Sequence, residues 1–69
     1  MKSISGKKLK QILEKKGWIH HRTTGSHWVY KNPAFKGVAS IPIHGNKDLP
    51  IGTLKSIMKD ANLTDDDLL

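Results

Sequence analysis

Two predicted strands and the loop between them decide the fold, and together they form the stretch SHWVYKNPAFKGVASIPI, residues 26–43. The strands are expected over residues 26–31 and 38–43, where apolar and polar side chains alternate. Between them lies a segment rich in residues that favour turns. A pairing that is symmetric about Phe35 and Lys36 gathers the apolar side chains on one face. A slip of one residue would mix the two faces, so the pattern favours this register.

This register decides which residues oppose one another. Three opposed pairs result, namely Tyr30 with Ile41, Trp28 with Ile43, and His27 with His44. Because directly opposed residues have Cβ atoms about 5 Å apart, the two imidazoles are expected to meet on the polar face. Trp28 and Tyr30 are expected on the apolar face, beneath the helices, although aromatic rings can also stack on bases.

A further strand is predicted at residues 18–23, before a tight hairpin turn at residues 24–25, where glycine allows the positive φ that such turns require. This turn places Arg22 opposite His27 on the polar face. It also places Trp18 on that face, although a core position suits tryptophan better. A bulge or a shift in this strand is therefore the alternative.

Helical patterns flank the strands on both sides. Ser5 can cap a helix over residues 6–16, whose apolar side chains recur at helical spacing, and Gly17 can end it. A second helix is expected to begin near Pro50, whose missing N–H costs nothing in a first turn. The buried stripe of this helix is expected to consist of Ile51, Leu54, Ile57, Met58 and Ala61.

The end of the chain predicts one more short turn, capped by Thr64, after which Leu68 and Leu69 are expected to pack back onto the core. The element order is then α-β-β-β-α. We therefore expect an α+β fold in which both helices cover one face of a three-stranded antiparallel sheet, with residues 1–69 as one domain.

The charge of the chain points to a polyanionic partner. The net charge is +6 over 69 residues, and Glu14 is the only acidic residue before Asp48. Positive potential therefore belongs to the first helix and the sheet, and such surfaces attract nucleic acids. A lysine surface that merely keeps the protein soluble is the alternative. The lysines expected to hold phosphates are Lys7, Lys8, Lys31, Lys36 and Lys47.

The composition also predicts where the protein acts. No apolar run approaches the roughly 18 residues that a membrane span needs, and residues 1–5 lack the apolar stretch of a secretory signal. The chain has no cysteine, which fits a reducing compartment. We expect a cytoplasmic, soluble monomer without membrane contact.

Two histidines and one arginine on the polar face suit the cleavage of RNA. One imidazole can take the proton of a ribose 2′-OH, and another can protonate the leaving 5′-oxygen, because histidine titrates near neutral pH. Arg22 can neutralise charge on the phosphorane. His27 is the candidate catalytic residue, and the candidate supporting residues are His44, Arg22, Ser26 and Gly25.

Other interpretations remain open. Zinc could bind His27 and His44, but it prefers three or four ligands and the chain offers only Asp48 nearby. We therefore expect no metal and no cofactor. His20 and His21 are interpreted as ordinary strand residues, of which one can face the core and the other the solvent. Residues 52–53 could cradle a phosphate at a helix N-terminus, although simple first-turn geometry explains them as well.

A series of short motifs runs through almost the whole chain. In order they are Gly17-Trp18, Arg22, Gly25-Ser26-His27, Pro42-Ile43-His44-Gly45, Gly52-Thr53-Leu54-Lys55-Ser56-Ile57 and Asn62-Leu63-Thr64. The series resembles the HicA toxins, which are small mRNA interferases of bacterial HicA–HicB toxin–antitoxin pairs of type II. Asn62 departs from the glycine of many members, but asparagine also tolerates the left-handed conformation.

The resemblance implies a fold like that of double-stranded-RNA-binding domains. It implies a metal-independent endoribonuclease that cleaves mRNA and arrests translation, with His27 as the catalytic residue and a cognate HicB antitoxin that covers the active site. Duplex-binding domains usually carry a lysine cluster where residues 48–51 stand here, so single-stranded mRNA is the expected substrate. A non-catalytic RNA-binding module and a domain that docks an acidic protein are the rival interpretations.

Overall fold

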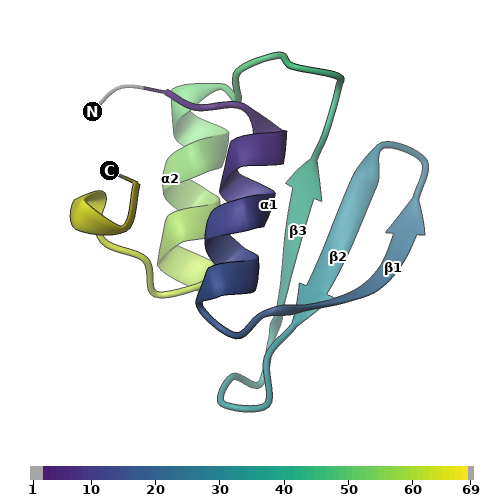
Figure 1. Ribbon diagram of the computed structural model, residues 1–69, viewed down its shortest axis with the longest axis vertical. Helices are drawn as coiled ribbons and strands as arrows, with labels where there is room; N and C mark the ends of the chain where they lie inside the picture. The colour runs from purple at the N-terminus through teal and green to yellow at the C-terminus, as the bar shows by residue number, and fades with distance from the viewer. Residues whose placement is uncertain (1–2, 69) are drawn as a thin grey trace.

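Two helices pack on one face of a three-stranded antiparallel sheet (Figure 1). The computed structural model describes residues 3–68. The elements in chain order are α1 (Gly6–Lys15), β1 (Ile19–Thr24), β2 (His27–Lys31), β3 (Val38–Pro42), α2 (Ile51–Asp60) and the short 3₁₀ helix η1 (Asp65–Leu68). The predicted α+β fold and its α-β-β-β-α order are confirmed, and the arrangement is that of double-stranded-RNA-binding domains.

The first helix begins and ends as its sequence predicts. The side chain of Ser5 accepts a hydrogen bond from the backbone N–H of Lys8 at 3.1 Å, which satisfies one free donor of the first turn. Leu9 and Leu13 on the apolar stripe are fully buried. Gly17, with a φ of 93°, takes the left-handed conformation that ends the helix.

The strands β2 and β3 pair in a register two residues away from the predicted one. Trp28 lies opposite Ile41, and His27 lies opposite Pro42. The hydrophobic alternation is preserved because a slip of two residues returns every side chain to the same face. The loop decides the difference. The side chain of Asn32 accepts a hydrogen bond from the backbone N–H of Ala34 at 2.9 Å, so the chain turns early.

The first hairpin also differs from the prediction. Its turn lies at Gly25 and Ser26, so that Thr24 opposes His27. Gly25 has a φ of 59°, as a tight hairpin turn requires. The register shifts between His20 and Arg22, which marks the bulge that the tryptophan position suggested.

The bulge decides which side chains of β1 face the helices. Trp18, just before β1, lies in the core with 3% of its surface exposed, whereas Ile19 is 63% exposed. His20 pairs with Tyr30 and therefore shares the helix-covered side of the sheet. The core between sheet and helices is built mainly from Leu9, Leu13, Tyr30, Ile41 and Leu54.

The predicted buried stripe of α2 is confirmed at Leu54, Ile57, Met58 and Ala61. It is wrong at Ile51, which is 39% exposed because it is the first residue of the helix.

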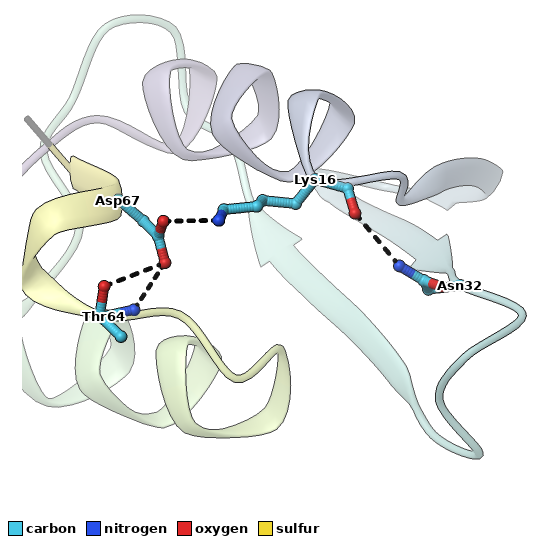
Figure 2. A network of polar contacts seen from close by, with 4 residues as sticks. All are labelled: Lys16, Asn32, Thr64 and Asp67. Atoms are coloured by element: carbon cyan, nitrogen blue, oxygen red, sulfur yellow. Dashed lines mark hydrogen bonds and ion pairs between the residues drawn. The ribbon is translucent and has the colours of Figure 1, made fainter.

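Beyond α2 the chain folds back against α1. Asn62 ends α2 with a φ of 55°, the left-handed conformation that asparagine tolerates. Figure 2 shows the contact that holds η1, in which the ammonium of Lys16 lies 2.7 Å from the carboxylate of Asp67. Leu68 packs against the core, and Leu69 lies outside the described residues. No helix within residues 3–68 combines the length and the apolar character that crossing a membrane requires.

Candidate functional site

His27 is the first residue of β2 and follows directly after the hairpin turn. Its side chain is exposed, and it lies on the face of the sheet that the helices leave open. Its neighbours are Thr24 of β1 and Pro42 of β3. Side chains alternate between the two faces along a strand, and Trp28 and Tyr30 lie on the helix-covered face. His27 and Val29 therefore lie on the open face. An imidazole in this position is open to a ligand from solution.

Arg22 shares the open face with His27, but it does not oppose that residue as predicted. It pairs with Val29, one alternate residue further along β2. Diagonal neighbours of this kind lie about 7–8 Å apart, which long side chains can span. The guanidinium of Arg22 can therefore reach a phosphate that lies beside His27.

His44 does not oppose His27, and the predicted direct pairing of the two imidazoles is wrong. Pro42 takes that position, and His44 lies beyond the end of β3 in an exposed connection. The two strands remain joined for one more residue, because the backbone N–H of Ile43 donates to the carbonyl oxygen of Ser26 at 2.8 Å. His44 and Pro42 line the same hollow, which is also lined by Lys47, Asp48, Leu49, Pro50 and Thr53.

Gly25 and Ser26 act through the backbone. Gly25 supplies the positive φ of the turn, and Ser26 anchors the end of β3 through its carbonyl oxygen. Together they fix the position of His27 relative to Pro42. These two residues position the candidate catalytic residue.

Both helices begin at the end of the sheet where His27 lies (Figure 1). Gly6, the first residue of α1, packs against the carbonyl oxygen of Pro42, and the start of α2 borders the hollow beside His44. Helix N-termini carry partial positive charge from their free N–H groups. This end of the molecule therefore favours an anion electrostatically.

The predicted phosphate-binding lysines are all exposed, but they do not converge. Lys7 and Lys8 lie in the first turn of α1, and Lys47 lies in the hollow beside His44. Lys31 and Lys36 line a second hollow at the opposite end of the sheet. His27 and Lys31 lie four residue steps apart along β2, which corresponds to about 13 Å. The lysines could contact successive phosphates of one strand.

The structure gives His20 a role that the sequence did not reveal. Its ring lies beside Trp28, with 4.9 Å between the ring centroids, on the helix-covered side. The bulge in β1 places the ring there. The sequence signal of that bulge is the predicted position of Trp18 on the open face, which does not suit a tryptophan. Within residues 3–68, no three side chains suited to a metal ion come together.

The fold and this site define a small basic α+β protein that presents an exposed histidine beside a hairpin turn. The sequence matches the family described as HicA toxin of bacterial toxin-antitoxin over residues 6–63. The match covers most of the chain, so the chain belongs to this family. It is the toxin of a toxin–antitoxin pair, and its partner is an antitoxin. No curated protein matches the sequence closely enough to be named as a relative.

Proposed function

We propose that this toxin is an endoribonuclease that cleaves single-stranded mRNA without a metal ion, with His27 as its catalytic residue. The observation that carries the proposal is the exposed imidazole of His27 on the open face, at the end where both helices begin. A phosphate bound there would lie within reach of a titratable ring and of Arg22. Cleavage of mRNA would arrest translation and growth.

The chemistry uses the nucleophile that RNA itself provides. His27 takes the proton from a ribose 2′-OH, and the 2′-oxygen attacks the adjacent phosphorus. The bond from phosphorus to the 5′-oxygen breaks, leaving a 2′,3′-cyclic phosphate and a 5′-hydroxyl once a proton is supplied to the leaving oxygen. Because the nucleophile is internal, no metal ion is required to activate water.

The supporting residues have distinct roles. Arg22 stabilises the charge that develops on the phosphorane oxygens. His44, at the border of the same end, supplies the proton for the leaving oxygen when the RNA lies over Pro42. Lys7, Lys8, Lys31, Lys36 and Lys47 hold flanking phosphates.

The antitoxin partner is proposed to be a HicB protein that covers the open face around His27. The exposed basic residues on this face would suit acidic side chains of such an inhibitor. The free toxin acts as a cytoplasmic monomer, where it meets both mRNA and antitoxin.

The first experiment replaces the candidate catalytic residue. His27→Ala is expected to reduce cleavage of a single-stranded RNA by about 10²–10⁴-fold, the usual contribution of one acid–base group. It is also expected to relieve growth arrest on expression. His21→Ala is the matched control, since it removes an exposed histidine from the bulge of β1 and should leave cleavage intact. Equal loss in both variants would contradict the assignment.

Two further measurements separate the rival functions, and a third tests the role of His44. Cleavage in the presence of EDTA is expected to continue, whereas complete loss would favour a metal-dependent reaction. A non-catalytic RNA-binding module would leave the RNA intact at every protein concentration. Cleavage that survives His44→Ala unchanged would remove His44 from the mechanism and leave His27 in place.

A further inference from the structure

A second surface lies on the opposite side of the sheet from His27. It is a groove between α1 and the strands, lined by Lys7, Lys10, Gln11, Trp28 and Ile43. We refer to it as the helix-side groove. The helices pack closest to β3, so the hairpin of β1 and β2 extends beyond them (Figure 1). The groove opens where that cover ends.

Trp28 forms the aromatic wall of the helix-side groove. Its side chain is half-buried, with its inner part against the core. The ring of His20 lies against it, tilted by 41°, and is held by a contact of 2.8 Å between its Nε2 and the hydroxyl of Thr23. The bulge in β1 is what brings His20 and Thr23 to the same side. The indole is therefore supported from β1 and fixed in orientation.

The charge of the groove is positive. The ammonium of Lys10 lies 5.2 Å from the centre of the Trp28 ring, and Lys7 lies one turn earlier on α1. None of the described residues that line the groove is acidic. Glu14, further along α1, lies 3.7 Å from Lys10 and accepts a hydrogen bond from the hydroxyl of Tyr30 at 2.9 Å. Glu14 therefore offsets part of the charge of Lys10, whereas Lys7 makes no ion pair within residues 3–68.

We propose that the helix-side groove binds one nucleotide of the single-stranded RNA. Its base stacks on the face of Trp28 over which the Lys10 ammonium lies in the free protein. Lys10 moves off the ring and, with Lys7, holds the phosphate. The amide of Gln11 can donate to or accept from the edge of the base. An aromatic wall beside cations is the usual way in which proteins hold unpaired nucleotides. The proposal rests on the proposed function, because it adds a subsite for the same RNA.

The position of the groove lets one RNA strand reach both sites. His27 and Trp28 are consecutive residues of β2, so their side chains point to opposite faces near the hairpin turn. A strand that passes over Gly25 and Ser26 can place one nucleotide in the groove while a neighbouring phosphate lies at His27. An acidic segment of the antitoxin would need only the cations, and it would leave the aromatic pair of Trp28 and His20 unused. Single-stranded RNA would use both the cations and the aromatic pair.

The test measures binding of a single-stranded oligoribonucleotide to the His27→Ala protein, which keeps the RNA intact. Adding Trp28→Leu is expected to weaken binding roughly 5- to 150-fold, the usual effect of losing one base–aromatic stack. Circular dichroism checks that this variant folds. The double variant Lys7→Gln, Lys10→Gln is expected to weaken binding as well, and it leaves the core untouched. Lys59→Gln, at the far end of α2, is the matched control and should bind as the parent does.

Fluorescence gives a second readout. Trp18 is buried in the core, so quenching on addition of RNA is expected to come from Trp28 and to disappear in a Trp28→Phe variant. A duplex RNA, whose bases already stack on one another, is expected to compete poorly.

Each other outcome overturns the inference. Unchanged RNA binding in both the Trp28→Leu and the double lysine variants would remove the subsite while the proposed function stands. Competition by duplex RNA equal to that by single-stranded RNA would also remove the subsite. So would variants of the groove that lose antitoxin binding but keep RNA binding. If the His27→Ala protein binds no RNA, the proposed function fails together with the subsite.

Discussion

Gly6 lies where the start of α1 meets the end of β3, and this contact leaves no room for a side chain. A Cβ on Gly6 would lie 2.6 Å from the carbonyl oxygen of Pro42 and 3.1 Å from the Cγ1 atom of Ile43. A backbone oxygen cannot swing aside as the end of a side chain can. Because Pro42 is the cross-strand neighbour of His27, this packing also supports the candidate site.

We expect Gly6→Ala to lower the free energy of unfolding by about 1–3 kcal/mol, the usual cost of overpacking. Urea denaturation measures it. The control is Gly52→Ala, because a Cβ there meets nothing within 4 Å and alanine restricts the unfolded chain. That variant is expected to be more stable by about 0.4–1 kcal/mol. A Gly6→Ala protein as stable as the parent would show that α1 can shift away from β3.

At the residue scale, the sequence predicted which face each side chain occupies better than which residue it opposes. His27 was placed on the open face because apolar and polar residues alternate, and alternation survives a slip of two residues. The pairing with His44 depended on the length of the loop. The turn at Asn32 follows from one hydrogen bond to its side chain. The alternation of apolar and polar residues does not predict such a bond.

At the element scale, the short helix η1 is held to α1 by the ion pair of Lys16 and Asp67. The ammonium of Lys16 holds the pKa of Asp67 below its usual value, and hydrogen bonds from the backbone and hydroxyl of Thr64 add to this effect. The interaction joins the end of the chain to the end of α1 (Figure 2). The pKa of the carboxyl is lower when the protein is folded, so its ionised form stabilises the fold.

We expect Asp67→Asn to lower the Tm at neutral pH, and the difference from the parent to vanish in acid. The stabilisation is complete above the unfolded pKa of about 3.9 and is lost as pH falls through the lower folded pKa. Thermal unfolding at a series of pH values measures it. Asp65→Asn changes the net charge equally but removes an exposed carboxylate, so it is the control. Equal effects of both variants would mean that only net charge matters.

At the element scale, capping residues made the prediction of α1 reliable, whereas α2 begins after Pro50 without a side-chain cap. Ser5 and Gly17 mark the beginning and the end of α1 through local geometry that involves few neighbours. The register of β1 is harder to predict. Trp18 is buried in the core, but the predicted turn, one residue before the observed one, places this side chain on the open face. The bulge between His20 and Arg22 reverses the alternation and so lets Trp18 face the core. Local pattern alone does not resolve such conflicts.

For the whole molecule, the distribution of charge decides how the proposed RNA substrate would bind. The net charge is +6, and the exposed lysines lie at several separate places around the sheet. Binding to a single strand should therefore weaken as salt rises, since each neutralised phosphate releases counterions. The slope of log affinity against log salt counts those contacts.

We expect Lys31→Gln in the His27→Ala protein to reduce this slope by about 0.7, the value for one phosphate contact on a single strand. Binding of an oligoribonucleotide measured across a salt series gives the slope. Lys59→Gln should leave it unchanged. An unaltered slope in the Lys31→Gln protein would mean that the RNA does not run along the open face from His27 to Lys31.

The whole-molecule arrangement was predictable because apolar periodicity gives the element order, and the order leaves few ways to cover a three-stranded sheet. The helix-side groove was not predictable. Trp28 was expected beneath the helices, and only the position of α1 over β3 leaves part of the ring uncovered.

The edge strand β1, which the helices leave uncovered, has a consequence for the lifetime of the protein. All six residues of β1 are exposed, so this strand contributes little to the burial that keeps the chain folded. Its amide hydrogens should exchange with deuterium through local opening, well before those of β3. Cellular proteases could then cut at this rim while the helices remain packed, which would make turnover of the toxin faster than its global stability suggests.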